Sequence, residues 1–212
     1  QAVLDGAVGQ ELLAAPQSAR LRGLGYYDAG SRSFYSTERP VYTPEDLTGL
    51  KIRVQESQTA LNMVRQLGGS PTPIAWGELY TALQQGVVDG AENNPPSFYL
   101  SKHYEIARYF TLDEHTAVPD LLLISESVWS QLNTTQQQWL QRAVDDSVAL
   151  QRGLWQDMTE AALANVAAAG VTIIRPDKGL FRTRVAAMKK SYEGTDIGQL
   201  IARIDAVVPD RD

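Results

Sequence analysis

The sequence predicts an α/β fold in which parallel strands alternate with helices. Short apolar segments at 50–54, 70–74 and 87–88 are separated by segments whose apolar residues recur at helical spacing. Glycine follows each intervening segment, at 68–69 and at 86, as expected where a helix ends. The chain has 212 residues, of which 43% are hydrophobic, so it is long enough to bury a core. Ligands of such folds bind beyond the carboxyl ends of the strands.

The first part of the chain predicts a broken helix followed by two short strands. Apolar residues at 2–19 recur at helical spacing, and Pro16 interrupts the pattern near its end. The apolar and aromatic segment 21–27 predicts a buried strand that ends in the turn-forming residues 28–30. A second short strand is expected at 33–35.

Helix signals mark the alternating region that follows. Thr43, followed by Pro44 and two acidic residues, predicts a capped short helix. Ser57 is expected to cap the helix after the strand at 50–54. The next helix is expected at 78–85.

The last part predicts two strands and a long helix. Segments 109–112 and 121–124 predict strands separated by a polar connector. Thr134 or Thr135 is expected to cap a helix that continues to Ala169. The elements expected after it are a strand at 171–174 and a helix from Phe181 onward.

The composition excludes several classes of function. A formal net charge of −6 provides no basic field for nucleic acid. Without cysteine there are no disulfides, thiol nucleophiles or thiolate metal sites. No metal-ligand spacing and no phosphate loop occurs, and we expect no metal and no cofactor. His103 and His115, the two histidines, are expected at the surface or at helix ends. No segment has the roughly 18 consecutive apolar residues of a membrane helix, and nothing at Gln1 resembles a signal peptide.

Arg53 is a candidate anion ligand because it lies late in the strand at 50–54, where the ligand crevice is expected. Its planar guanidinium can hold a carboxylate through two parallel, charge-assisted hydrogen bonds. A solvated charge at the end of the strand explains the residue equally well. The spacing alone does not decide between the two roles.

Other polar and aromatic side chains also follow predicted strands. The segment 89–96, DGAENNPP, offers amides to hydroxyl or carboxylate groups, although asparagine and proline also favour ordinary turns. Trp76 could form the wall of a sugar pocket, although packing in the core is the simpler explanation of this residue. Asp89 and Glu92 lack the second catalytic element that acid/base chemistry needs.

Two long motifs, at 47–54 (LTGLKIRV) and at 78–93 (ELYTALQQGVVDGAEN), carry a family resemblance. They are similar to the DLxGLKxRV strand and the ExYxALQxGxVDGxEN stretch of the substrate-binding proteins of tripartite ATP-independent periplasmic (TRAP) transporters, the DctP-like family. The resemblance runs along nearly the whole chain, with the motifs in the family's order.

The resemblance implies a ligand site. In that family the arginine of the RV strand clamps the ligand carboxylate, and this residue corresponds to Arg53. The asparagine of the second motif corresponds to Asn93, and the aromatic residue before it to Trp76. Arg32 corresponds to an arginine in a GxR turn. Gln55, two residues beyond Arg53, is added because it is expected on the same face of the strand.

The segments YYDAGSRSFY, RVQ and AENN are similar to those of family members that bind hexuronates such as glucuronate and galacturonate. A uronate needs a carboxylate clamp, amide partners for its hydroxyls and an aromatic wall. A dicarboxylate, an α-keto acid or an ectoine-like solute would use the same arginine.

The resemblance also implies a class II-like, two-lobe periplasmic-binding-protein fold with parallel-rich sheets, flanking helices and a long lobe-connecting helix. The N-terminal third of that fold is expected to be missing, which leaves the first lobe incomplete. Residues 1–30 and 119–158 are the expected remnant of the first lobe with the connecting helix, and residues 31–118 and 159–212 the expected second lobe. Such a chain is expected to expose apolar surface of the first lobe.

The implied function is the capture of an organic acid in the periplasm and its delivery, unchanged, to a TRAP membrane permease. An α/β enzyme acting on a small carboxylic acid, with Asp89 or Glu92 as general base, is the alternative from another class. The sequence lacks the nucleophile motif, phosphate loop or metal spacing that would favour it. A sensory module that has lost its ligand is the third reading, and the presence of Arg32, Arg53 and Asn93 together argues against it.

Overall fold

The computed structural model describes residues 1–207, and their contacts form two compact units. Unit 1 consists of Gln1–Ala29, Pro119–Trp155 and the described residues from Tyr192 onward, and unit 2 consists of Gly30–Val118 and Gln156–Ser191. The segment after Ser191 corrects the expected division, because its helix α9 (Asp196–Val207) contacts α1 (Ala2–Asp5) and α2 (Ala7–Ala14) of unit 1. Residues 208–212 of the expected second lobe lie outside the described residues. The identity of the units as lobes stays a prediction.

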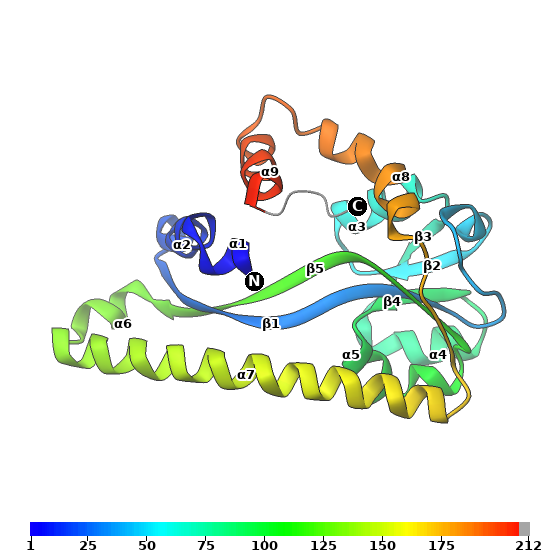
Figure 1. The fold of residues 1–212 in the computed structure, drawn as a ribbon, viewed down its shortest axis with the longest axis horizontal. Helices are drawn as coiled ribbons and strands as arrows, with labels where there is room; N and C mark the ends of the chain where they lie inside the picture. Colours follow the sequence, from blue (N-terminus) through cyan, green and yellow to red (C-terminus); the bar gives the residue numbers. More distant parts are fainter. Residues whose placement is uncertain (208–212) are drawn as a thin grey trace. The chain divides into compact units, whose positions relative to one another are not determined.

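The strands form one mixed sheet in the order β3-β2-β4-β1-β5-β6 (Figure 1). They are β1 (Leu21–Ser36), β2 (Lys51–Val54), β3 (Ser70–Pro73), β4 (Gly90–Asn93), β5 (Tyr109–Ser125) and β6 (Thr172–Ile174). β2 runs parallel to β3 and β4, and β5 runs parallel to β6. The predicted parallel alternation is therefore confirmed around β2, whereas β1 runs antiparallel to β4.

Two predicted breaks do not interrupt the strands. β1 continues for 16 residues through the expected turn at 28–30, and β5 continues for 17 residues through the expected polar connector. The turn signals leave only local irregularities, at Gly30 with φ of 70° and at Glu114 with φ of 50°. Isolated irregular residues are tolerated inside a long strand when its ladder continues on both sides.

β4 begins later than predicted. The expected strand at 87–88 is wrong, because Val87 is 48% exposed and the strand comprises Gly90–Asn93. Gly90 lies so close to β1 that an added Cβ atom would meet the Tyr35 carbonyl oxygen at 2.3 Å. The segment predicted as a loop therefore supplies a fully buried strand of the sheet.

Helices cover the two faces of the sheet in unit 2. They are α3 (Gln58–Gln66), α4 (Leu79–Gln84), α5 (Pro95–Leu100), α8 (Lys178–Lys190) and the short η2 (Pro44–Leu47), η3 (Trp76–Glu78) and η4 (His103–Glu105). As predicted, Ser57 caps α3 by accepting a hydrogen bond from the backbone N–H of Ala60. One core joins Phe34 and Ile52 to α3 and α8, and the other joins Tyr35 and Ala91 to α4 and α5.

Unit 1 contains the broken helix and most of the long helix. α1 and α2 are separated at Gly6, and η1 (Ala15–Ala19) contains the expected break at Pro16. After α6 (Glu126–Gln131), α7 (Thr134–Ala168) runs for 35 residues, as predicted. Its cap is Asn133 instead of a threonine, because the Asn133 and Gln136 side chains accept hydrogen bonds from each other's backbone N–H groups. α9 was not predicted.

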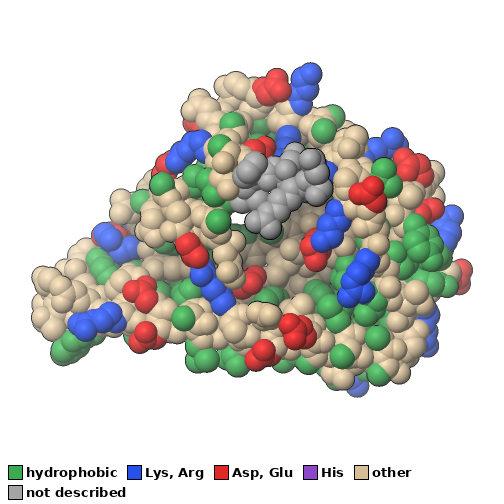
Figure 2. Space-filling view, viewed as in Figure 1, with side chains coloured by type: hydrophobic (Ala, Val, Ile, Leu, Met, Phe, Trp, Pro, Cys, Tyr) green, Lys and Arg blue, Asp and Glu red, His purple; other side chains and the backbone are tan. Residues whose placement is uncertain are grey.

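The surface carries no large field of one sign on the face shown in Figure 2, where acidic and basic side chains are interspersed. Within residues 1–207, no helix combines the length and the apolar character needed to cross a membrane.

Candidate functional site

Arg53 is a buried cation with an unsatisfied donor. It lies near the end of β2 and is 2% exposed. Its Nε donates a hydrogen bond to the Ile74 carbonyl oxygen at 2.8 Å, whereas its buried Nη1 has no hydrogen-bond partner. Among the described residues, no carboxylate lies within ion-pair distance of this guanidinium.

The electrostatics of Arg53 favour an anion. Burial lowers the pKa of its guanidinium, because water no longer stabilises the positive charge. A buried charge without a partner is costly, and a ligand carboxylate would supply both the opposite charge and the missing acceptor. The unpaired Nη1 makes Arg53 the candidate anion contact of this site.

Arg32 has the opposite arrangement, because its donors are used inside unit 2. It lies in β1 and forms an ion pair with the Glu92 carboxylate, including a hydrogen bond of 2.7 Å from Nη2 to Oε1. Nη2 also donates to the Glu92 carbonyl oxygen, and Nη1 donates to Asn93 Oδ1 at 3.0 Å. The structure thus joins two expected site residues, Arg32 and Asn93, through direct contact.

Glu92 continues this contact into a buried chain of charges. His115 Nε2 lies 3.5 Å from Glu92 Oε2, and His115 Nδ1 lies 2.7 Å from Asp113 Oδ2. Burial alone would lower the pKa of His115, but Asp113 and Glu92 outweigh it and raise the pKa to about 9. Burial likewise opposes ionisation of Glu92, yet His115 and Arg32 hold the pKa of its carboxyl below the usual value.

The remaining expected residues differ in exposure. Trp76, in η3, is 45% exposed, and the Arg53 guanidinium carbon lies 5.6 Å from its ring centroid. Asn93 is 5% exposed and follows Ala91, the neighbour of Arg53 across the β2–β4 ladder, by two residues. Asn93 and Arg53 therefore emerge on the same face of the sheet. Gln55 follows β2 as an exposed residue outside the strand.

Both histidines correct the sequence expectation. His103 is 2% exposed, and its Nδ1 lies 2.8 Å from the Tyr35 hydroxyl. The side chain of His115 is 4% exposed. His103 contacts Tyr35, and His115 contacts Glu92 besides its near neighbour Asp113. Contacts to other strands such as these are not visible in the local sequence pattern.

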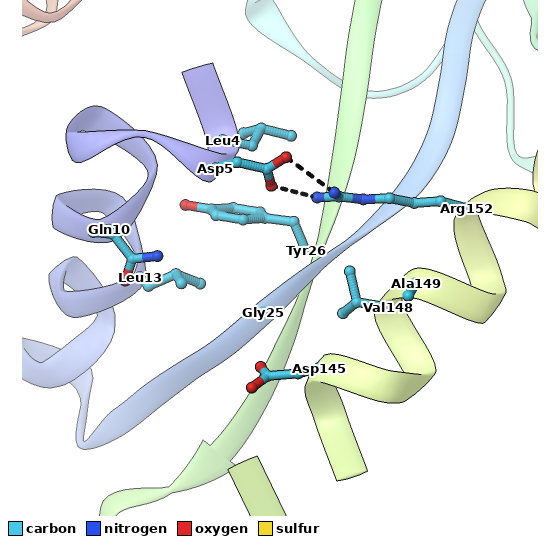
Figure 3. A pocket seen from close by; sticks show the side chains of 10 residues that line it. All are labelled: Leu4, Asp5, Gln10, Leu13, Gly25, Tyr26, Asp145, Val148, Ala149 and Arg152. Atoms are coloured by element: carbon cyan, nitrogen blue, oxygen red, sulfur yellow. Dashed lines mark hydrogen bonds and ion pairs between the residues drawn. The ribbon is translucent and has the colours of Figure 1, made fainter. Parts of the chain in front are cut away.

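Unit 1 has a separate cavity of about 240 Å³ (Figure 3). Arg152 of α7 reaches across it to Asp5 of α1, with hydrogen bonds of 2.7 and 3.0 Å. Tyr26 also lines it and donates its hydroxyl proton to the Gly9 carbonyl oxygen at 2.7 Å. Arg152, Asp5 and Tyr26 thus have partners within unit 1, whereas Arg53 has a buried donor without one. No cluster of metal-binding side chains occurs in residues 1–207.

The fold is that of a family of solute-binding proteins. Residues 1–195 match the family model described as bacterial extracellular solute-binding protein, family 7, and the chain belongs to this family. The predicted family and its fold class are thereby confirmed.

Solved structures of the family resemble the chain closely. The periplasmic TRAP solute-binding protein of Xanthobacter autotrophicus Py2, with bound β-D-galacturonate, is 41% identical and has a TM-score of 0.89. That of Chromohalobacter salexigens, with bound D-glucuronate, is 35% identical and has a TM-score of 0.92. Each match covers 97% of this chain and 69% of the other chain.

Curated relatives place the chain in the same family. A solute-binding protein of Chromohalobacter salexigens is 38% identical over 184 residues, which cover 86% of this chain and 55% of the relative. The sialic acid-binding periplasmic protein of Vibrio cholerae is 31% identical over 185 residues, covering 87% and 57%. The chain therefore spans about half the length of the curated relatives it matches.

Proposed function

We propose that this chain forms part of an extracytoplasmic protein that captures a hexuronate, glucuronate or galacturonate, and delivers it unchanged to a TRAP membrane permease. The observation that carries the proposal is the buried guanidinium of Arg53 with its unpaired Nη1. A carboxylate completes this site because it brings a negative charge and two acceptors in the plane of the guanidinium.

The neighbouring side chains fit the remainder of a sugar acid. The half-exposed Trp76 indole offers an apolar surface beside Arg53, as the face of a sugar ring requires. Asn93 provides an amide on the same face of the sheet for a hydroxyl group. Solved structures of relatives containing galacturonate or glucuronate support the choice of hexuronate.

Arg32 serves a different purpose in this proposal. Because Glu92 and Asn93 already accept from its donors, Arg32 fixes the Asn93 amide instead of providing the main anion contact. Gln55 is exposed next to the end of β2 and can reach a ligand hydroxyl only from the rim. The family's description as extracellular solute-binding proteins supports the proposed periplasmic location and permease partner.

Isothermal titration calorimetry of the full-length natural protein that contains this sequence tests the proposal. Glucuronate and galacturonate are expected to bind with micromolar or tighter affinity, and succinate much more weakly. Binding of succinate or a keto acid with no response to either uronate would reject the hexuronate assignment. Chromatography of the ligand after long incubation separates binder from enzyme, because a binding protein returns the acid unchanged and the rival enzyme yields a product.

A further inference from the structure

His103 has no role in the proposed site, yet it is buried between two elements that carry site residues. Its ring centroid lies 5.2 Å from that of Trp76, with the two planes inclined by 60°. Its Nδ1 lies 2.8 Å from the hydroxyl of Tyr35 in β1. His103 therefore contacts the exposed indole on one side and the sheet on the other.

Tyr35 is a firm attachment point for this imidazole. It is 1% exposed, and its ring packs against Phe98 and Phe110 with centroid distances of 4.7 and 6.2 Å. Close-packed aromatic groups in a core leave little room for movement. The hydrogen bond between Tyr35 and His103 thus fixes the position of the imidazole relative to the sheet.

Trp76 has no comparable support of its own. It is 45% exposed and begins a helix of three residues. The ring contacts that define its orientation are the edge of His103 and the guanidinium of Arg53. Edge-to-face contact between aromatic rings is directional, so the imidazole selects the plane in which the indole lies.

We propose that His103 is a positioning residue that sets the plane of the Trp76 indole and thereby strengthens the binding of ring-shaped acids. The inference rests on the proposed function, because it assigns the indole to the ring of the ligand. Burial, reinforced by the positive charge of Arg53, lowers the pKa of His103 to about 4. The imidazole is therefore neutral at physiological pH and adds no second positive charge beside Arg53.

A double-mutant cycle measured with galacturonate tests this inference. His103→Ala is expected to weaken galacturonate binding by about tenfold when Trp76 is present. In the Trp76→Ala background it is expected to weaken binding by less than about twofold, because the effects of substitutions at two coupled residues are not additive. Equal losses in both backgrounds would overturn the proposal. The matched control is Tyr104→Ala, since Tyr104 lies in the same short helix but packs against Phe98 and Tyr99. This control is expected to reduce stability without changing affinity.

A measurement without ligand separates failure of this inference from failure of the proposed function. In two-dimensional ¹H–¹⁵N spectra, His103→Ala is expected to shift or broaden the indole N–H signal of Trp76, and Tyr104→Ala to leave it in place. An unchanged indole signal in the His103 variant would reject the positioning role whether or not any uronate binds. Absence of uronate binding together with a shifted indole signal would reject the proposed function alone.

Discussion

Arg32 and Arg53 lie close together in unit 2, but their donors are used differently. Arg32 donates to Glu92 and Asn93, whereas Arg53 has one backbone acceptor and an unpaired Nη1. Replacing Arg32 should therefore disturb the protein's own contacts, and replacing Arg53 should disturb mainly the ligand's. In the proposed site, Arg32 therefore has a structural role and Arg53 is the arginine that binds the ligand.

The two histidines are expected to give the folding stability a maximum near pH 6.5. The pKa of His115 is raised to about 9, so the stability it contributes is complete below pH 6.5 and is lost as the pH rises toward 9. The pKa of His103 is lowered to about 4, so its contribution is present above pH 6.5 and is lost as the pH falls toward 4. Each shift corresponds to roughly 3 kcal/mol over its range.

Urea unfolding between pH 4.5 and 9.5 measures both effects. His115→Gln is expected to flatten the alkaline side of the profile, and His103→Phe the acidic side. If the unsubstituted protein had the same pH profile as both variants, neither histidine would have the shifted pKa that the structure indicates.

Residues of the candidate site could be predicted from the sequence only where they lie in or directly after a predicted strand. Arg53 was found because it lies late in the alternating strand β2, and the family resemblance gave Asn93 and Trp76, already noted after predicted strands, their place in the site. The partners of Arg32 and His115 were not found, because Glu92 lies in another strand and was assigned to a loop. Such contacts between strands depend on the strand register, which is difficult to predict from the sequence.

At the scale of helices and strands, alanine substitutions of two glycines are expected to change the unfolding free energy in opposite directions. Gly153 lies inside α7 with nothing within 4 Å of an added Cβ atom, so Gly153→Ala should raise the unfolding free energy by about 1 kcal/mol through helix propensity. Gly90→Ala should lower it by more than this, because the methyl group would collide with the Tyr35 carbonyl oxygen. Thermal unfolding of both variants checks the pair, and a destabilised Gly153 variant would contradict the role given to helix propensity.

The helices were predicted better than the strands. Caps and terminal glycines are local signals, and they located α3 and the ends of α7 to within a few residues. The long strands β1 and β5 were each divided in two, because turn-forming residues at 28–30 and the polar run before Pro119 look like breaks. Hydrogen bonding to neighbouring strands overrides these local preferences.

At the scale of the whole chain, exposed apolar side chains predict surface binding of hydrophobic dyes. In unit 1, Trp139, Leu150 and Leu154 of α7 are 62%, 64% and 58% exposed, and Leu121 and Leu123 of β5 about 40%. These 212 residues, expressed alone, should therefore bind 8-anilinonaphthalene-1-sulfonate more strongly than full-length relatives do. Equal dye fluorescence per residue would contradict this expectation.

The central claim is that the Arg53 guanidinium binds the carboxylate of the ligand. Its most direct test is calorimetric titration of galacturonate into the longest natural chain and into its Arg53→Ala and Arg53→Lys variants. Arg53→Ala is expected to lose at least ~100-fold in affinity, since one partner of a buried charge pair is removed. Arg53→Lys is expected to lose much of the affinity as well, because an ammonium group cannot reproduce the planar fork. Binding by Arg53→Ala with unchanged affinity would contradict the account.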